Sequence, residues 1–353
     1  MRIVIGIATM ELGGAERQVS YLARGFVRAG HQVNVVLMRG GANFSRLVDS
    51  GASISMIPRH RMGLIAPVVY QLRCIRPDVA YMWQRPFDII GGLAAWMLDI
   101  PCIHAERTAP DCIPAKGYLA MRRAVVRLSS GVIANSEEGK AHWRKHLRPD
   151  TLVEHIPNMV PSEELSKVVP SPESAGALVA VGRLDEGKNV MTLLRAVARL
   201  QREGTPCPVL VVGDGPCRAQ LSEFIRANAL DSVVTLCGPR TDVWALMKGS
   251  RAFVSLSRFE GSPNAVIEAA MLGVPLFLSD IAAHRSITSN GHFVDTSSED
   301  AVVNGIRQLC EYRNDIQQAP AGIGRAGNGI DTPDVIEQHL TLFRRVTKIR
   351  GLG

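Results

Sequence analysis

The stretch AFVSLSRFEGSPNAVIEAAMLGVP, residues 252–275, decides the fold. It opens with an apolar, β-branched run, Ala252–Leu256, which has the length and composition of a strand. A break follows, and Ser262 stands before a proline where a helix N-cap is expected. The helix is predicted over Asn264–Leu272, because a glycine and a proline come directly after it. The stretch therefore predicts a strand, a turn and a helix of an α/β protein.

Two carboxylates flank this turn, Glu260 in the loop and Glu268 in the helix. The N-terminus of a helix binds phosphate well, and ligands of open α/β sheets bind beyond the carboxyl ends of the strands. Carboxylates also accept hydrogen bonds from sugar hydroxyls, so the turn suits a sugar joined to a phosphate. An equally simple interpretation makes Glu260 a partner of the helix dipole and Glu268 an exposed helix residue.

The same alternation of strands and helices extends in both directions along the chain, which predicts parallel, doubly wound sheets. A proline-rich linker, Pro157–Gly176, separates two such series. A last amphipathic helix is predicted from Pro333 to about Lys348. The strands expected in the two series are Ile3–Ile7, Val33–Leu37, Ser53–Ile57, Val79–Trp83, Cys102–His104, Val132–Ala134 and Leu152–Ile156, then Ala177–Val181, Val209–Val212, Val233–Cys237, Ala252–Leu256 and Leu276–Leu278.

The composition fits an ordinary globular protein of 353 residues, long enough for two separate cores. Its net charge of +7 is concentrated in residues 1–160, where 20 Lys and Arg stand against 12 Asp and Glu. Seven scattered cysteines without C-x-x-C spacing predict reduced thiols in a cytoplasmic compartment, with neither a disulfide framework nor a zinc site. No cleavable signal is expected. The apolar run Ile89–Leu98 is about half the roughly 20 residues needed to span a bilayer.

Three glycine-containing loops follow predicted strands. GGAE (13–16) precedes the first helix, GRLDEGKN (182–189) contains Arg183 and Lys188, and VGDGP (212–216) precedes another helix. None completes the G-x-G-x-x-G fingerprint of dinucleotide-binding proteins. Two cations in one loop could neutralise a diphosphate leaving group, although solvated loop charges are the more common fate of Lys and Arg.

The spacing of Glu260 and Glu268, with seven residues between them, resembles the E-x7-E signature of retaining glycosyltransferases of family 4. GGAE and GRLDEGKN stand where that family has its other loops. The resemblance implies the GT-B architecture, with two Rossmann-like doubly wound domains facing across a cleft. It implies an acceptor-binding domain over residues 1–160, a nucleotide-sugar-binding domain over 177–330, and a C-terminal helix over 331–353 that crosses back to the first domain.

The family pattern also implies roles for single residues. Glu268 would bind the ribose and Glu260 the donor sugar, while Arg183 and Lys188 would bind the diphosphate without a metal ion or other cofactor. Glu260, Arg183, Lys188 and Arg107 are the catalytic candidates. The predicted donor-binding residues are Gly14, Arg183, Lys188, Gly213, Arg240, Glu260, Gly261, Ser262, Asn264, Ala265 and Glu268.

The acceptor side departs from the family pattern. Relatives often carry a histidine six residues after a proline, close to the reacting carbon. In PCIHAERTAP (101–110) that position is Arg107, and His104 comes three residues earlier, where a buried strand histidine is expected. Glu106 and Arg107 are the acceptor-binding candidates. Ser286 also stands where many relatives have an acidic residue.

The helix KGYLAMRRAVVRL (116–128) places Arg122, Arg123 and Arg127 among apolar residues. Such a helix can lie on an anionic membrane, or it can pack on a core with solvated arginines. The resemblance implies a cytoplasmic retaining glycosyltransferase that is peripheral on the membrane. It would move a sugar from a UDP-sugar to a glycan or lipid-linked acceptor in cell-surface polysaccharide biosynthesis, with no nucleic-acid partner. A sugar-nucleotide epimerase and a non-catalytic sugar-nucleotide-binding module are the alternatives.

Overall fold

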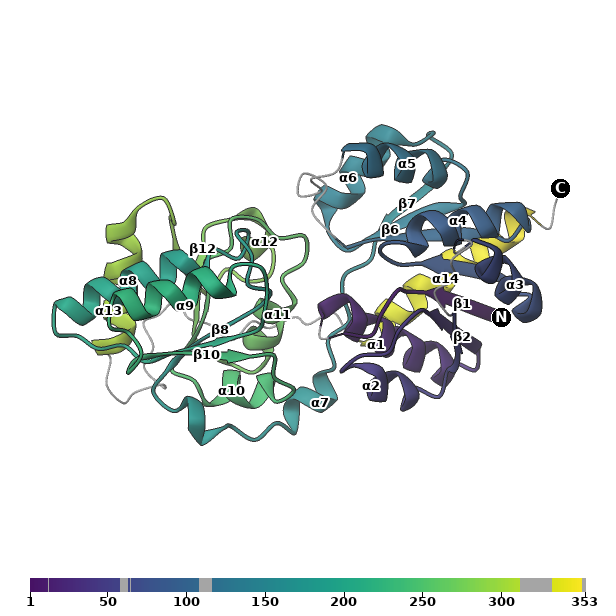
Figure 1. Ribbon diagram of the computed structural model, residues 1–353. Coiled ribbons are helices and arrows are strands. Elements are labelled where there is room, and N and C mark those ends of the chain that lie inside the picture. Colours follow the sequence, from purple (N-terminus) through teal and green to yellow (C-terminus); the bar gives the residue numbers. More distant parts are fainter. Residues whose placement is uncertain (12, 58–62, 64, 108–115, 312–331, 351–353) are drawn as a thin grey trace. The chain divides into compact units, whose positions relative to one another are not determined.

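The computed structural model describes the chain except residues 12, 58–62, 64, 108–115, 312–331 and 351–353 (Figure 1). The chain divides into two compact units, Met1–Met159 with Ile330–Gly353 and Val160–Gly329. Each unit has its own sheet, of seven and six strands, and all pairings between the named strands are parallel. The predicted α/β class with two Rossmann-like domains is confirmed. The glycine-rich stretch 321–329 and the predicted boundary at residue 330 lie outside the described residues.

The first unit contains a sheet with the strand order β3-β2-β1-β4-β5-β6-β7. All seven strands predicted for this half are present, with ends shifted by one or two residues. Its elements are β1 (Arg2–Gly6), α1 (Gly14–Arg28), β2 (Gln32–Leu37), α2 (Phe44–Val48), β3 (Ser53–Met56), α3 (Ile65–Ile75), β4 (Val79–Met82), α4 (Phe87–Met97), β5 (Cys102–Glu106), α5 (Lys116–Val126), β6 (Gly131–Ala134), α6 (Glu137–His146), β7 (Leu152–His155) and α14 (Thr332–Arg350).

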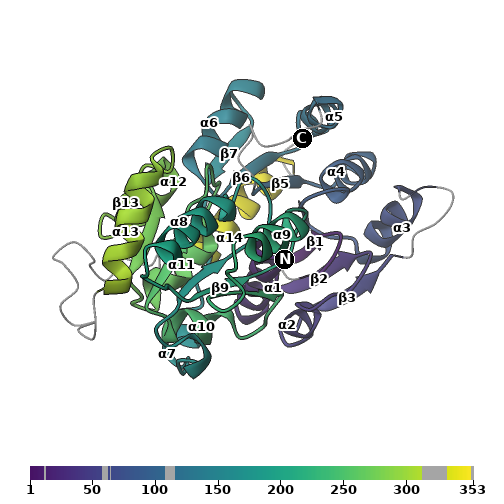
Figure 2. The ribbon, with the colours of Figure 1, turned by 60° about the vertical axis from the view of Figure 1, so that its left-hand side comes forward.

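Helices cover both faces of this sheet, which is why central strands such as β4 and β6 are apolar at every position and buried throughout. Ile3 and Ile5 of β1 pack with α1, α2 and α14, whereas Val4 packs with α3 and α4 on the opposite face. The C-terminal helix belongs to the first core, where Phe343 lies with its ring centroid 5.5 Å from that of Phe26. Figures 1 and 2 show α3, α4 and α5 following one another along one face.

The second unit contains a sheet with the strand order β10-β9-β8-β11-β12-β13. The sequence did not predict β13, which has three residues, or the short helices α7 and η2 inside the proline-rich linker. Its elements are α7 (Ser162–Ser166), η2 (Pro172–Ser174), β8 (Leu178–Val181), α8 (Val190–Arg202), β9 (Val209–Val212), α9 (Arg218–Ala227), β10 (Val234–Gly238), α10 (Val243–Gly249), β11 (Ala252–Ser255), α11 (Asn264–Met271), β12 (Leu276–Ser279), α12 (Ala282–Arg285), β13 (His292–Val294) and α13 (Glu299–Glu311).

Helix α11 begins where it was predicted to begin, but its N-cap lies one residue later than expected. The helix begins at Asn264, its N-cap is Pro263, and no side chain accepts a hydrogen bond there, so the expected N-cap role of Ser262 is wrong. Pro263 has φ −81° and ψ 78°, outside the helical region. The turn from β11 therefore enters the helix through Pro263, whose side chain has no polar atom with which to cap it.

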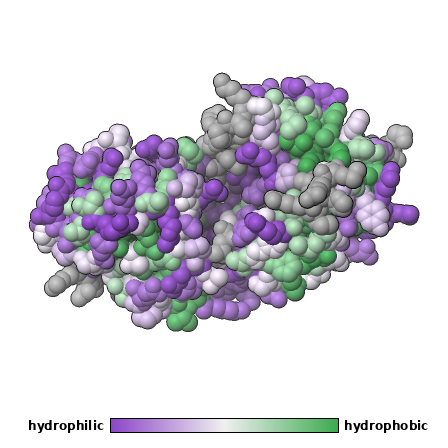
Figure 3. Space-filling view, in the orientation of Figure 1, coloured by the Kyte–Doolittle hydropathy of each residue, from purple (hydrophilic) through white to green (hydrophobic). Residues whose placement is uncertain are grey.

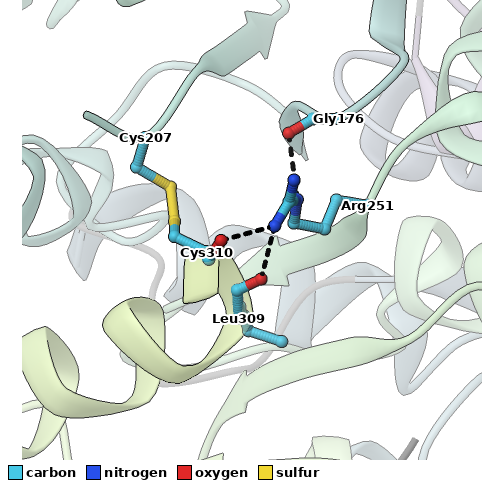
Figure 4. Close-up of a disulfide and its surroundings, with 5 residues drawn as sticks. All are labelled: Gly176, Cys207, Arg251, Leu309 and Cys310. Atoms are coloured by element: carbon cyan, nitrogen blue, oxygen red, sulfur yellow. Dashed lines mark hydrogen bonds between the residues drawn. A yellow bond between two sulfur atoms is a disulfide. The ribbon is translucent and has the colours of Figure 1, made fainter. Parts of the chain in front are cut away.

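The expectation of reduced thiols is wrong for two of the seven cysteines. Cys207 and Cys310 form a disulfide, although 103 residues separate them (Figure 4). Cys207 stands just before β9 and Cys310 lies in α13, so tertiary packing and not local spacing brings them together. Arg251 strengthens the same region, because its guanidinium donates to the carbonyl oxygens of Leu309, at 3.0 Å, and Cys310, at 2.7 Å (Figure 4).

Reduction of this disulfide should lower the free energy of unfolding of the second unit by about 2–4 kcal/mol, because the open chain regains the conformational freedom of a long loop. Urea unfolding with and without dithiothreitol measures the effect. A Cys310→Ser protein should be as unstable as the reduced wild type and should not respond to dithiothreitol. Equal stability of the oxidised and reduced wild type would contradict the assignment.

Candidate functional site

The strand order of the second sheet places its topological switch point between β8 and β11. From β8 the chain crosses to β9 on one side, and β11 then lies on the other side of β8, so the connections leave this point in opposite directions. Ligands of doubly wound sheets bind at such a switch point, beyond the carboxyl ends of the strands. The loops after β8 and β11 are GRLDEGKN and LSRFEGSP, the two segments with the predicted diphosphate and sugar contacts.

Lys188 and Glu260 meet at this edge. The Lys188 Nζ forms an ion pair with Oε1 of Glu260, and the Ser257 hydroxyl donates to the same oxygen at 2.8 Å. The exposed fractions of the two charged side chains are 29% and 11%. A cation and a carboxylate are therefore held together at a partly open position, where the cation can meet an anionic ligand and the carboxylate can accept hydrogen bonds from hydroxyls.

Hydrogen bonds hold the two loops together. The Asn189 Nδ2 donates to the carbonyl oxygen of Leu256 at 3.1 Å, and the Arg258 N–H donates to that of Gly187 at 2.8 Å. The Asp185 carboxylate accepts from the Lys188 N–H at 3.1 Å. These contacts fix the backbone of Lys188. Its side chain is therefore positioned beside Glu260 before any ligand binds.

Glu268 lies in α11 and is buried, with 5% of its surface exposed. The indole Nε1 of Trp244, in α10, donates to its Oε2 at 2.9 Å. The interpretation of Glu268 as an exposed helix residue is therefore wrong. A buried carboxylate with an oriented oxygen suits the recognition of two neighbouring hydroxyls, such as those of a ribose. No pattern in the sequence indicates this role of Trp244.

Replacing Trp244 by phenylalanine should weaken UDP binding about tenfold, since a hydrogen bond to a charged group contributes about 1.5 kcal/mol or more. The aromatic packing is kept, so the free energy of unfolding should change little. Isothermal titration calorimetry with UDP measures the effect. Trp96→Phe, at an exposed position of the first unit, is the matched control, and equal affinities of the two variants would contradict a role for Trp244.

A buried histidine, His284, supports the Glu260 loop, and no sequence pattern indicates it either. The His284 Nδ1 lies 3.0 Å from the carbonyl oxygen of Ser279, and the Ser279 hydroxyl donates to the carbonyl oxygen of Ser257 at 2.6 Å. Burial lowers the pKa of His284, so the ring is neutral near pH 7. Through these contacts α12 and β12 support the loop residue whose hydroxyl binds Glu260.

The other donor-binding residues predicted for the second unit lie in its loops and at the start of α11. Arg183 is exposed, with its Nε 3.7 Å from Asp185. Gly213 has φ +135°, and a Cβ there would meet the Gly182 carbonyl oxygen at 1.9 Å, so only glycine allows these two loops to touch. Arg240 is bound to the carboxylates of Asp242, at 2.7 Å, and Glu173, at 2.9 Å. Gly261, Ser262, Asn264 and Ala265 form the entry to α11.

The remaining predicted residues belong to the first unit. Gly14 is the first residue of α1. Glu106 is buried at the end of β5, where its Oε2 accepts from Arg122 and from the Trp143 indole, both at 2.7 Å. The Glu106 carboxylate therefore lies inside the first unit, between Arg122 and Trp143. Arg107 is half-buried and donates to Asn158 and to the Tyr81 hydroxyl, both at 2.7 Å.

The basic face expected on α5 does not include Arg122. Its guanidinium is buried, with Nε 3.1 Å from Asp88 and Nη1 2.7 Å from Glu106. Arg123 is half-buried and Arg127 is exposed. Two acidic partners from β5 and α4 thus hold Arg122 in the interior, a long-range pairing that helical spacing does not reveal.

His104 is fully buried on β5, as expected for a strand histidine. Its Nε2 lies 3.7 Å from the Cys102 sulfur, and its Nδ1 has no hydrogen-bond partner among the residues that the structure describes. Burial, with a smaller effect of Arg122, lowers its pKa to about 3. His104 is therefore neutral in the folded protein and is enclosed away from solvent.

This burial predicts a pH-dependent stability. The unfolded His104 has a pKa near 6.5, so below that pH the unfolded chain binds a proton that the folded chain excludes, and stability falls as the pH drops toward 3. His104→Gln should show a slope shallower than that of the wild type by up to about 1.4 kcal/mol per pH unit between pH 6 and 4. Burial raises the pKa of Asp88 to about 6, so Asp88 makes stability rise as the pH falls through this range. This opposite contribution is the same in the wild type and in His104→Gln. Urea unfolding at several pH values tests this, and identical slopes would contradict it.

Among the described residues, no three His, Cys, Asp or Glu side chains are grouped as a metal site requires. None of the helices in the described part of the chain is long and apolar enough to cross a bilayer.

Two family matches cover most of the sequence. Residues 12–164 match Glycosyltransferase Family 4, and residues 161–321 match Glycosyl transferases group 1. Over 280 residues the chain is 23% identical to the Campylobacter jejuni GalNAc-alpha-(1->4)-GalNAc-alpha-(1->3)-diNAcBac-PP-undecaprenol alpha-1,4-N-acetyl-D-galactosaminyltransferase, covering 76% of each chain. Over 259 residues it is 24% identical to the Escherichia coli UDP-Gal:alpha-D-GlcNAc-diphosphoundecaprenol alpha-1,3-galactosyltransferase, covering 66% of each. Over 159 residues it is 26% identical to an uncharacterized glycosyltransferase of Methanocaldococcus jannaschii, covering 42% of this chain and 39% of that one.

Solved structures agree on the fold. HepE of Anabaena, in complex with UDP and glucose, superposes with a TM-score of 0.78 at 18% identity, and both chains are covered completely. A glycosyltransferase from Rickettsia africae superposes with a TM-score of 0.77 at 15% identity, with 98% of each chain covered. With consecutive matches to both halves, the E-x7-E pair at the β8–β11 edge and two Rossmann-like units, the chain belongs to the GT-B glycosyltransferases of family 4.

Proposed function

We propose that this glycosyltransferase moves a sugar from a UDP-sugar to a lipid-linked glycan acceptor, with retention of the anomeric configuration, in the biosynthesis of a cell-surface polysaccharide. The observation that carries the proposal is the arrangement at the β8–β11 edge, where the Lys188–Glu260 pair and the Trp244–Glu268 pair follow the neighbouring strands. Two relatives named for transfer to diphosphoundecaprenol-linked glycans support the acceptor class, and HepE, solved with UDP and glucose, supports the donor class.

The second unit would bind the donor. Lys188 and Arg183 would neutralise the negative charge of the diphosphate as the bond from the sugar C1 to the phosphate oxygen breaks. In many enzymes a metal ion performs this role. Glu260 would accept hydrogen bonds from the sugar hydroxyls and Glu268 from the ribose. The backbone N–H groups at 261–265, at the start of α11, would bind the diphosphate. Gly213 would lie near the nucleoside, and Arg240 would reach the base by leaving one of its two carboxylate partners.

The first unit would bind the acceptor and would supply Gly14 to the donor diphosphate. Arg107 would orient the acceptor, and the buried Glu106 would hold the end of β5, from which Arg107 follows, in place. The acceptor oxygen forms its bond to C1 on the face that the phosphate leaves, and its proton passes to the departing phosphate oxygen. The reaction then needs no metal ion and no protein nucleophile. We place the enzyme in the cytoplasm, at the membrane that holds its acceptor.

Turnover of the full chain with UDP-hexoses and UDP-N-acetylhexosamines tests the proposal. A synthetic N-acetylglucosaminyl-diphospholipid serves as the acceptor, free UDP is quantified, and NMR gives the anomeric configuration of the product. We expect UDP release that requires the acceptor, and an α-linked product from an α-linked donor. Conversion of a UDP-sugar without acceptor would indicate an epimerase. UDP binding without UDP release from any donor would indicate a binding module.

A further inference from the structure

The two oxygens of the Glu260 carboxylate have different surroundings. Ser257 is fully buried, and its hydroxyl donates to Oε1 of Glu260 at 2.8 Å. The Nζ of Lys188 is paired with the same oxygen. Among the residues that the structure describes, none donates a hydrogen bond to the other oxygen, Oε2, which is not enclosed by the protein. Both partners therefore occupy one oxygen of the carboxylate and leave the other open.

The fixed direction of Glu260 is what sets it apart from other polar surface groups. Hydrophilic side chains predominate on the second unit in the view of Figure 3, so a partly exposed carboxylate is not by itself evidence of a binding site. Lys188 reaches Oε1 from the loop after β8, whereas Ser257 reaches it from the loop after β11. Two partners from different loops restrict the rotation of the carboxylate. Oε2 therefore keeps its direction before a ligand arrives.

Buried groups anchor Ser257 in turn. The carbonyl oxygen of the preceding residue, Leu256, accepts from the Asn189 Nδ2 at 3.1 Å. The carbonyl oxygen of Ser257 itself accepts from the Ser279 hydroxyl at 2.6 Å, and the Ser279 Oγ lies 3.1 Å from the His284 Nδ1. Asn189, Ser279 and His284 are all buried. A fully buried serine cannot touch a ligand, so any effect that it has on the donor must pass through the carboxylate that it binds.

We infer that Ser257 is a positioning residue for the donor sugar, and that Oε2 of Glu260 is the atom that accepts a hydrogen bond from a sugar hydroxyl. The inference rests on the proposed function, since it takes the donor sugar to lie at Glu260. An ionised carboxylate only accepts hydrogen bonds, and each of its oxygens has two lone pairs. The Ser257 hydroxyl keeps Oε1 turned toward the interior of the unit. Without that hydroxyl the carboxylate can rotate, and Oε2 loses its fixed direction.

Isothermal titration calorimetry of the full chain with UDP and with UDP-sugars tests the inference. The sugar nucleotides are UDP-glucose, UDP-galactose and their N-acetyl forms, and the one that binds the wild type most tightly is used. Ser257→Ala should weaken the binding of this UDP-sugar about tenfold, the effect of one hydrogen bond to a charged group, and should leave the affinity for UDP within about twofold. General damage to the loop would weaken both ligands, because the loop backbone would also bind the diphosphate.

A second pair of measurements shows whether Ser257 acts through Glu260. In a protein that already carries Glu260→Ala, the change Ser257→Ala should alter the affinity for the UDP-sugar less than about twofold, because the carboxylate that couples the two is gone. Ser257→Cys, which replaces the hydroxyl by a weaker donor, should give an affinity between those of the wild type and Ser257→Ala. The matched control is Ser250→Ala, which removes a buried hydroxyl of the same unit that donates to the Met247 carbonyl oxygen at 2.7 Å. It should bind both ligands as the wild type does.

Three outcomes would overturn the inference. These are unchanged UDP-sugar binding by Ser257→Ala, an equal loss of affinity for UDP and for the UDP-sugar, and the same loss from Ser257→Ala with and without Glu260. All of these affinities are measured without an acceptor, so they are independent of the transfer reaction. A wild type that shows the expected pattern of affinities but releases no UDP with any acceptor would contradict the proposed function and leave the role of Ser257 standing.

Discussion

Glu268→Ala should abolish detectable UDP binding. The carboxylate is buried in α11 and held by the Trp244 indole at 2.9 Å, so it is oriented before the nucleotide arrives. Two hydrogen bonds from ribose hydroxyls to a charged, desolvated acceptor should contribute about 3–6 kcal/mol, or a 100-fold or greater loss of affinity when they are removed. Removing the carboxylate also leaves the Trp244 N–H without this acceptor. Isothermal titration calorimetry with UDP measures the loss.

The matched control for this change is Glu223→Ala, which removes an exposed carboxylate from α9 of the same unit. It should bind UDP with wild-type affinity. Thermal unfolding without ligand separates binding from folding, because a folded Glu268→Ala protein should still unfold cooperatively. If it bound UDP within threefold of the wild type, Glu268 would not contact the nucleotide.

Lys188→Ala should lower kcat/KM by about 10²–10³, the range seen when one group that stabilises a developing charge is removed. The ammonium group is held at the switch point by its ion pair with Glu260 and by the contacts of the loop around it. As the sugar leaves, negative charge grows on the diphosphate, and the cation stabilises that state more than the ground state. The effect should therefore appear mainly in kcat. Initial rates of UDP release over a range of donor concentrations separate kcat from KM.

Two variants control for charge and for position. Lys188→Arg keeps the cation and should recover part of the rate. Lys248→Ala removes a lysine of the same unit whose Nζ bonds the Val168 carbonyl oxygen at 2.7 Å, and it should leave kcat/KM within about twofold. A rise in KM with unchanged kcat in Lys188→Ala would mean that the lysine only binds the donor. Because Lys188 and Glu260 touch, their alanine variants should not be additive.

The sequence predicted the fold well because its strands are buried on both faces. Runs such as those of β4, β6 and β9 are apolar throughout, and the helices between them reveal the parallel order. The E-x7-E spacing also predicted the candidate site, since it ties a loop carboxylate to one in the following helix. The short strand β13 was not predicted, because its three residues, His292–Val294, are too few to show a hydrophobic periodicity.

Contacts between distant segments could not be predicted. The Cys207–Cys310 disulfide joins residues 103 apart, and Arg122 is drawn inside by acidic partners on two other elements. The same holds at the site, where Trp244 and His284 reach their partners from α10 and α12. Such residues carry no local pattern, because their roles depend on which elements pack together.

Hydrogen–deuterium exchange of the full chain with and without UDP tests whether the β8–β11 edge of the second unit binds the donor nucleotide. We expect slower exchange in two segments, 182–189 and 257–268, because the diphosphate and the ribose would contact both loops and the start of α11. Protection confined to other segments, or no protection at UDP concentrations that give binding by calorimetry, would contradict it.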